Sequence, residues 1–386
     1  MLWLSYGETF RNSTLARFYI MCFNHIYLFV VLCAFTTSPV MAQVASTAQF
    51  SEPPDNLFNR DVVRIKDVVR VSDTERALRN QRREAILEKI DYILSIPENE
   101  LDIWKVSLTM AHDAYPDLDM KSLTEEFEAI VSRAKDMTPS DASPDLRIRT
   151  LNTLLYRRMG IEYDKTDFVG EKLINRYAHG VVETKKGTCA NMATFYIAVA
   201  QRLGYPVYAV AAPQHLFARY VDPSLEKQNI DPASQGAWSS DDDYIHDMEI
   251  PLKGIQNGVY MKNMTRRELV AEIIADHGAY YYAQVLKDYQ TAGAILRRAL
   301  EVSPKSAEFW RLLGAVHIDW AREDYDRDLR NTKKEIGHAL IDKAKEMGVG
   351  KPLPKDYWKH PPQKRRQLTP VSPIPPWDMK LTLKLQ

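Results

Sequence analysis

Apolar residues between positions 84 and 158 recur with the spacing of amphipathic helices. A residue every three or four positions places one side of each helix in a core. Breaks fall at Pro97, at Pro116 and in the polar segment 138–144, where prolines and small polar residues favour turns. The pattern predicts successive helices with apolar faces formed by Ile86, Ile90, Ile93 and Leu94; Leu101, Trp104, Leu108 and Ala111; Leu123, Phe127, Ile130 and Val131; and Ile148, Leu151, Leu154 and Leu155.

The middle of the chain changes from helical to strand-like patterns. Residues 189–203 are apolar on nearly every side, which is typical of a buried central helix. Residues 207–211 predict a buried strand, and residues 215–220 and 244–250 alternate as the two sides of a strand do. We interpret 222–243 as a loop. This order predicts an α+β fold, in which a helical N-terminal part leads to a central helix on a small antiparallel sheet.

Helical spacing returns from Arg266 onward. Residues 292–304 are similar to the second half of a tetratricopeptide repeat, and residues 310–314 restart its first half. A second copy is interrupted by charged residues at 322–330 before a helix near 335–347. We predict helical-repeat hairpins that offer a surface to a protein partner; an ordinary helical hairpin cap is the alternative.

Residues 1–42 have the pattern of an export signal. Arg11 and Arg17 come before the apolar run 18–35, and small residues end the segment at Ala42. The alternative is an uncleaved anchor, because the run is long enough to begin to span a bilayer. We therefore expect an exported protein, periplasmic or secreted, or one held at the inner membrane by this segment, its only membrane contact.

Charge and composition exclude several functions. The 386 residues contain 51 Lys and Arg and 51 Asp and Glu, a balance that argues against nucleic acid as a partner. Glycine is scarce, at 15 residues, and no phosphate-binding glycine motif is present. His215, His246 and Asp247 lack the paired spacing of a zinc site. We expect no cofactor and no metal.

Cysteine usage points to the candidate chemistry. Of the 3 cysteines, Cys22 and Cys33 lie in the predicted signal, so the exported chain keeps Cys189 alone. A single cysteine cannot form an internal disulfide. It is either a buried small hydrophobe or a thiol kept for its reactivity, and the count favours neither.

The surroundings of Cys189 favour reactivity. Thr188 is a suitable N-cap, so Cys189 falls in the first helical turn, where the helix dipole favours a thiolate. His215 begins a strand two elements later and is a candidate base. Asp247, in the next predicted strand, is a candidate to orient the imidazole. Each residue alone has a structural explanation; together they form a moderately specific set.

These residues resemble the core of bacterial transglutaminase-like proteins. The shared pattern is G-x-C at 187–189, R-L-G-x-P at 202–206 and H-x-F-x-R at 215–219. Asp247 and Glu249 fall where that subgroup has Asn-x-Glu, and tetratricopeptide-like helices often follow. The resemblance implies a papain-like arrangement with Cys189 as nucleophile, His215 as general base and acid, and Asp247 as orienting group. It leaves the oxyanion-hole side chain open among Asn175, Tyr177 and Thr184.

Two hypotheses follow. The first is an exported thiol enzyme that hydrolyses an amide in a protein or peptide substrate, as a protease or amidase, or transfers its acyl group. The second is a non-catalytic binding or assembly protein of the cell envelope. The predicted domains are a signal peptide (1–42), an extended arm (43–80), a transglutaminase-like domain (81–278), tetratricopeptide-like helices (279–347) and a proline-rich tail (348–386).

Overall fold

The computed structural model describes residues 73–168 and 170–350. The predicted signal peptide, most of the predicted arm and nearly all of the proline-rich tail lie outside these residues. Helix α3 (Asp73–Ser95) begins inside the segment predicted as an extended arm, so that boundary is wrong for residues 73–80. The buried residues Ile86, Ile90 and Ile93 recur along one face of this helix and explain its packing.

The predicted run of amphipathic helices is confirmed, and the helices begin at polar caps. The side chains of Asp102, Asp119 and Ser143 each accept a hydrogen bond from a backbone N–H of the following first turn. Pro144 occupies the first position of its helix, where its missing N–H costs nothing. The helices are α4 (Ile103–Ala114), α5 (Met120–Asp136) and α6 (Pro144–Asn152), which continues into the π-helix η2 (Thr153–Arg158).

A short irregular region then leads to the central helix. Strand β1 (Glu162–Tyr163) pairs in parallel with β2 (Lys186–Gly187). Between them lie the 3-10 helix η3 (Leu173–Arg176) and helix α7 (Ala178–Thr184). The β1–β2 pair therefore returns the chain to the start of the central helix.

The central helix packs on a small antiparallel sheet, as predicted. Helix α8 (Cys189–Arg202) is buried along most of its length. The sheet has the order β3-β4-β5-β6, and every neighbouring pair is antiparallel. Its strands are β3 (Val207–Ala212), β4 (His215–Tyr220), β5 (Asn229–Asp231) and β6 (Ala237–Ser239).

Two strand assignments from the sequence are wrong. The segment 222–243, expected to be a loop, contains β5 and β6. The segment 244–250, expected to be a strand, lies mostly in helix α9 (Asp241–Asp247). Ser240 caps α9 together with Asp243, and three aspartates in its first turn favour the positive end of a helix. Local capping therefore outweighed the alternation of residues 244–250.

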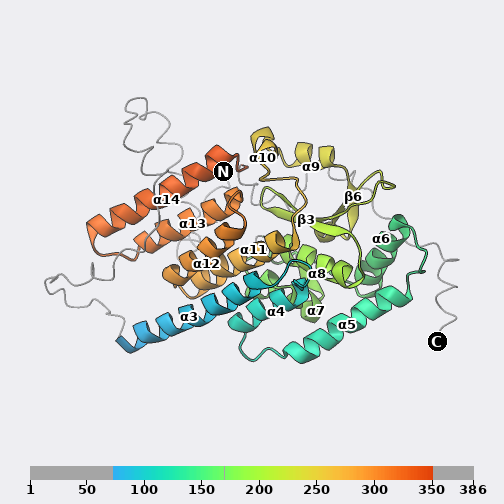
Figure 1. The fold of residues 1–386 in the computed structure, drawn as a ribbon, viewed down its shortest axis with the longest axis horizontal. Helices are drawn as coiled ribbons and strands as arrows, with labels where there is room; N and C mark the ends of the chain where they lie inside the picture. The colour runs from blue at the N-terminus through green and yellow to red at the C-terminus, as the bar shows by residue number, and fades with distance from the viewer. Residues whose placement is uncertain (1–72, 169, 351–386) are drawn as a thin grey trace, which may run out of the picture. The chain divides into compact units, whose positions relative to one another are not determined.

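The two faces of the sheet contribute to different apolar clusters. Ala218 and Tyr220 of β4 join the main core, while Phe217 joins a smaller cluster with Tyr244 and Met248 of α9. The alternation predicted for β4 is thus confirmed. In Figure 1, α8 and α9 lie on opposite sides of the sheet.

Helices follow the sheet to the end of the described chain. Gly314 and Gly337 let α13 and α14 approach closely: a Cβ on either glycine would meet the backbone oxygen of the other at 2.6 and 2.8 Å. The tetratricopeptide-like repeat assignment stays a prediction. The helices are α10 (Leu252–Gln256), α11 (Arg266–Asp276), the π-helix η5 (His277–Val285), α12 (Tyr289–Val302), α13 (Ala307–Ala321) and α14 (Arg327–Met347).

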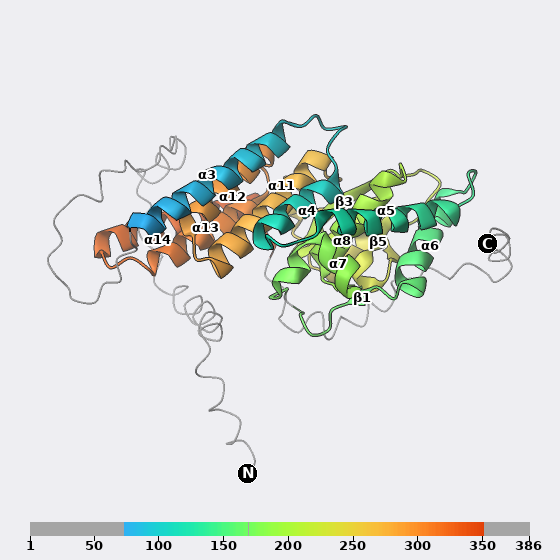
Figure 2. The same ribbon diagram turned by 90° about the horizontal axis from the view of Figure 1, so that it is seen from below.

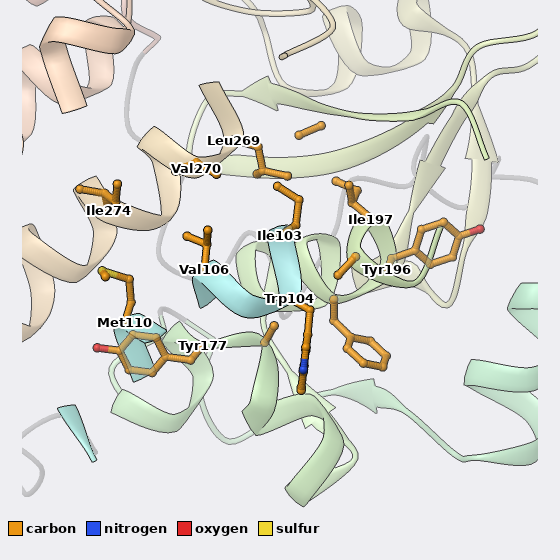
Figure 3. Packing of buried hydrophobic residues seen from close by; sticks show 14 of the residues in the cluster. Ile103, Trp104, Val106, Met110, Tyr177, Tyr196, Ile197, Leu269, Val270 and Ile274 are labelled. Atoms are coloured by element: carbon orange, nitrogen blue, oxygen red, sulfur yellow. The ribbon is translucent and has the colours of Figure 1, made fainter. Parts of the chain in front are cut away.

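One apolar cluster joins the first described helix to the last ones. Helix α3 lies alongside α12 in both views (Figures 1 and 2), and Arg298 contacts Asp91 at 2.7 Å there. Around α4, Val106 points toward Val270 and Ile274 of α11 (Figure 3). Trp104 points the other way and stacks on Phe127 with ring centroids 4.3 Å apart. Figure 3 also labels other members of the same apolar cluster, which are Ile103, Met110, Tyr177, Tyr196, Ile197 and Leu269.

The α+β prediction is confirmed: a helical N-terminal part, a central helix on an antiparallel sheet, and further helices behind it. Within residues 73–168 and 170–350, no helix is both long and apolar enough to cross a membrane.

Candidate active site

The site is built around the first turn of α8. The Thr188 backbone N–H donates to Asn191 Oδ1 at 2.7 Å, and its hydroxyl donates to the Asn175 carbonyl at 3.2 Å. Cys189 comes next and is half-buried, with its Sγ 3.9 Å from the Gln214 carbonyl oxygen. The thiol therefore lies at the positive end of the buried helix, against the turn that opens β4.

That turn holds a backbone conformation that side chains rarely adopt. Pro213 and Gln214 connect β3 to β4, since Ala212 pairs with His215. Gln214 has a φ of 53°, in the left-handed region, although it is not glycine. Left-handed residues of this kind cluster at functional sites, where surrounding structure compensates their cost. The turn sets His215 beside the start of α8.

His215 is enclosed by protein, and a carboxylate faces one of its nitrogens. Its side chain has no exposed surface, and Nε2 lies 3.5 Å from Asp231 Oδ2. Continuing the β4–β5 register, in which Ala218 pairs with Ile230, sets Phe217 opposite Asp231. His215 is two residues from Phe217, so His215 and Asp231 are diagonal neighbours on one face.

The Asp231 carboxylate is held by the turn that follows it. Its Oδ1 accepts from the Ala233 backbone N–H at 3.1 Å, and its Oδ2 accepts from the Ser234 hydroxyl at 3.1 Å. This carboxylate too is fully enclosed. Because the 3-10 helix η4 (Pro232–Ser234) fixes the carboxylate, its charge stays directed at the imidazole.

The electrostatics of the site favour an ionised thiol and a charged imidazole. Burial raises the pKa of the Cys189 thiol, but a hydrogen bond to His215 and the charge of that imidazole lower the pKa more, so the net shift is downward. Burial lowers the pKa of His215, while the charge and hydrogen bond of Asp231 and the contact with Cys189 raise it, with a net upward shift. The two shifts bring the thiolate–imidazolium pair toward neutral pH.

The structure brings Cys189 and His215 together and sets Asp231 beside them. The argument that led to Asp247 is wrong, because it required a strand next to β4 and Asp247 ends helix α9. Its Oδ1 lies 3.5 Å from Nδ1 of His246. The sequence reasoning missed Asp231 because β5 and β6 are too short to show a periodic pattern. The signal that was present is Asp231-Pro232, since Asp-Pro favours the start of a turn.

The three residues considered for the oxyanion hole all use their side chains elsewhere. Asn175 Nδ2 donates to Asp164 at 3.0 Å and to Asp167 at 2.7 Å. The Tyr177 hydroxyl lies 2.8 Å from Nδ1 of His277. The Thr184 hydroxyl donates to the Gly180 carbonyl at 2.7 Å. The backbone N–H groups of Cys189 and Ala190 open α8, where a helix leaves its first donors without intrahelical partners, and they lie beside the thiol.

A second buried histidine–aspartate pair lies in the same domain. His277 Nε2 lies 3.0 Å from Asp113 Oδ2, and the Tyr282 hydroxyl donates to the same oxygen at 2.8 Å. The Tyr177 hydroxyl occupies the other imidazole nitrogen. Because both ring nitrogens have partners, this pair joins α4, α7 and η5. Among the residues that the structure describes, no group of three or more His, Cys, Asp or Glu could hold a metal ion.

Comparison with known proteins finds a family model that matches the region around this site. Residues 121–272 match the model of the Transglutaminase-like superfamily, a stretch that runs from α5 into α11 and includes Cys189, His215 and Asp231. Residues 121–272 of the chain are thus similar to a transglutaminase-like domain.

Two curated relatives are UPF0162 proteins of Xylella fastidiosa, from the strains Temecula1 and 9a5c. Each is 24% identical over 127 residues, which is 33% of this chain and 44% of the relative. The chain therefore spans less than half the length of the curated relatives it matches.

Proposed function

We propose that the transglutaminase-like domain is a thiol enzyme that cleaves or transfers an amide bond of a protein or peptide. The observation that carries the proposal is the half-buried thiol of Cys189 at the start of α8, beside an enclosed His215 that faces an enclosed Asp231. A nucleophile, a base and a group that orients the base are the parts that such catalysis requires. Asp231 takes the role that the sequence had suggested for Asp247.

The residues would act in two half-reactions. The Cys189 thiolate attacks the amide carbon, and the negative charge on oxygen develops near the first-turn N–H groups of α8. The His215 imidazolium donates its proton to the leaving amine as the C–N bond breaks, which leaves a thioester on Cys189. Water or a second amine then attacks the thioester, His215 takes the proton, and the C–S bond breaks to restore the thiolate.

The arrangement of the imidazole assigns its two nitrogens. With Nε2 at Asp231, Nδ1 is the nitrogen available to exchange a proton with the thiol. Asp231 stabilises the imidazolium that forms and fixes the orientation of the ring. In its absence the ring would lose the charge that raises the pKa of His215.

In this proposal the enzyme acts outside the cytoplasm, and residues 1–42 are its export signal. The basic flank, apolar run and small-residue end of that segment support it. Sequencing the N-terminus of the exported protein should give a chain that starts near Gln43. Recovery of an intact Met1 would contradict cleavage and support the anchored form.

The test of the enzyme proposal is alkylation of Cys189 with iodoacetamide across pH. A free thiol titrates near pH 8.5, whereas a helix-terminal thiol paired with histidine titrates at about pH 3.5–7.5. Alkylation should persist well below about pH 7 and shift toward the free-thiol profile in His215→Ala. An apparent pKa above about 8 that does not change in His215→Ala would overturn the enzyme proposal and favour a non-catalytic binding protein.

A further inference from the structure

The residues on either side of Arg176 are hydrogen-bonded to the first turn of α8. The Asn175 carbonyl accepts the Thr188 hydroxyl at 3.2 Å, and the Tyr177 carbonyl accepts Asn191 Nδ2 at 3.3 Å. Cys189 lies between the two helix residues that make these bonds, and Arg176 lies between the two residues that accept them. The Cys189 charge is also one of the groups that raise the pKa of the Arg176 guanidinium, after burial, which lowers it, and Asp276 and Tyr280, which raise it.

The guanidinium is held in a fixed plane. Its Nη1 donates to Asp276 Oδ1 at 2.8 Å, and its Cζ lies 4.0 Å from the centre of the Tyr280 ring. The Tyr280 hydroxyl in turn donates to the Glu171 carbonyl. An ion pair on one side and an aromatic ring on one face leave the group little freedom to rotate.

The other edge of the guanidinium has unused donors. Nε is buried and has no hydrogen-bond partner among residues 73–168 and 170–350, and no acceptor for Nη2 is found in that part of the chain either. Buried donors without partners are rare in native proteins and call for an explanation. Nε and Nη2 together form the side-on fork that binds a carboxylate with two parallel hydrogen bonds.

A glycine lies over the guanidinium. A Cβ at Gly170 would lie 3.4 Å from Nη2, 3.5 Å from Cζ and 3.8 Å from Nε, which places it over the plane of the group in ordinary van der Waals contact. Gly170 has a φ of +69°, which favours glycine for backbone reasons as well. Glycine at this position therefore lets the chain pass close to the Arg176 guanidinium without a side chain over it.

We propose that Arg176 binds a carboxylate of the substrate, so that the preferred substrates are amides with an acidic group close to the scissile bond. The inference rests on the proposed function, since it places this carboxylate beside Cys189. Arg176 would then contact substrate through the Nε–Nη2 fork, with Asp276 and Tyr280 as positioning residues.

The test compares two small alkylating agents that differ by a carboxylate. Iodoacetate and iodoacetamide both react with the thiolate: the S–C bond forms, the C–I bond breaks, and iodide leaves. Because both consume the same thiolate, the ratio of their rates is independent of the fraction of thiol ionised. We expect the iodoacetate-to-iodoacetamide ratio to fall at least about tenfold in Arg176→Gln, the factor expected for loss of one charge-assisted hydrogen bond.

Two further variants sharpen the result. Arg176→Lys keeps the charge without the fork and should lower the ratio less than Arg176→Gln does. Arg202→Gln removes an arginine from the opposite end of α8, where it pairs with Asp102 and Glu128, and should leave the ratio unchanged. Thermal melting of each variant checks that it folds.

A measurement on the unaltered protein stands beside the variants. Sodium acetate should slow alkylation by iodoacetate more than sodium chloride does at the same ionic strength, because acetate occupies the fork. A ratio that stays within about twofold in Arg176→Gln, or equal effects of acetate and chloride, would overturn the proposal.

Failure of the enzyme proposal has a different signature. In that case iodoacetamide would react only at the pH of a free thiol and would be indifferent to His215→Ala. The ratio can still be measured at about pH 9, where a free thiol is mostly ionised. A ratio that depends on Arg176 there would support a carboxylate site on a protein without the proposed catalysis.

Discussion

Within residues 73–168 and 170–350, two fully enclosed histidines each face an aspartate, and they differ in what occupies the second imidazole nitrogen. In the pair His277–Asp113, the Tyr177 hydroxyl lies 2.8 Å from Nδ1 and Asp113 Oδ2 lies 3.0 Å from Nε2, so both ring nitrogens have partners. In the pair His215–Asp231, the neighbour is the half-buried thiol of Cys189. The same two residue types therefore serve as a fixed contact between helices in one place and as a candidate base in the other.

The comparison shows that burial and a carboxylate do not by themselves make a histidine catalytic. Such a histidine needs a group to exchange a proton with and access for a substrate. Tyr177 has 2% of its surface exposed, and Tyr282 has none, so the His277 pair is closed to a substrate. The thiol beside His215 belongs to Cys189, which is half-buried at the start of a buried helix.

The largest expected effect comes from removing the helices that follow His277, from η5 to α14. A chain that ends at Gly278 lacks Tyr282 and exposes apolar residues that Ala292, Ile295 and Leu296 cover in the main core. We expect it to lose cooperative melting, because the lost burial exceeds the usual margin of about 5–15 kcal/mol. Calorimetry measures this, with a chain that ends at Gly350 as the control. Equal melting of the two chains would show that these helices do not stabilise the domain.

The next effect separates the two histidines. His277→Phe leaves the Asp113 carboxylate and the Tyr177 hydroxyl without their partner, and should lower the free energy of unfolding by about 3 kcal/mol. Its Cys189 should still be alkylated at low pH, unlike that of His215→Ala. The exposed His338→Ala is the control and should change stability by less than about 0.5 kcal/mol. Loss of low-pH alkylation in folded His277→Phe would mean that the second pair also serves the site.

A smaller effect decides between two aspartates. Asp231→Asn removes the charge that raises the pKa of His215, so alkylation of Cys189 at about pH 6 should slow about tenfold, the effect of losing one hydrogen bond to a charged group. Asp247→Asn, which changes a carboxylate that pairs with His246, is the matched control and should have little effect. The reverse order of the two rates would restore Asp247 as the orienting group.

The smallest effect concerns the carboxyl of Glu272, whose neighbours are acidic, in contrast to Asp113, whose neighbour is a histidine. Burial raises the pKa of Asp113, but the hydrogen bonds and charges of His277, Tyr282 and Lys89 together lower it more. The pKa of Glu272 is raised to about 8 by burial and by the charges of Glu308, Asp276 and Glu268. A carboxyl whose pKa is higher in the folded than in the unfolded state binds its proton more tightly when the protein is folded. The free energy of unfolding should therefore fall as pH rises from about 4.5 to 8.

Glu272→Gln tests this sign. The variant should be more stable than the unaltered protein by about 1 kcal/mol at pH 8, after allowance for solvent screening, and nearly equal to it at pH 4.5. Urea unfolding at the two pH values measures the difference. A gain of the same size at both would point to packing rather than ionisation.

The sequence predicted the elements whose patterns are long. The helical stripes from Ile86 to Leu155 and the apolar run of α8 cover several turns each, and they appear where the spacing placed them. The position of Cys189 in the first turn of α8 also followed from a local feature, the cap at Thr188. Helix periodicity and capping are fixed within a few residues of chain, so a sequence reveals them.

The tertiary structure alone decided which carboxylate faces His215 and what surrounds Arg176. Asp231 belongs to a strand too short for a periodic signal, and its partner is chosen by the register of β5 on β4. Arg176 meets Asp276, 100 residues further along the chain, across the packing of separate helices. Contacts of this kind depend on how whole elements pack, and no local pattern encodes them. The sequence by itself thus determined the helices and the place of Cys189 at the start of α8, and the fold determined which residues surround that thiol.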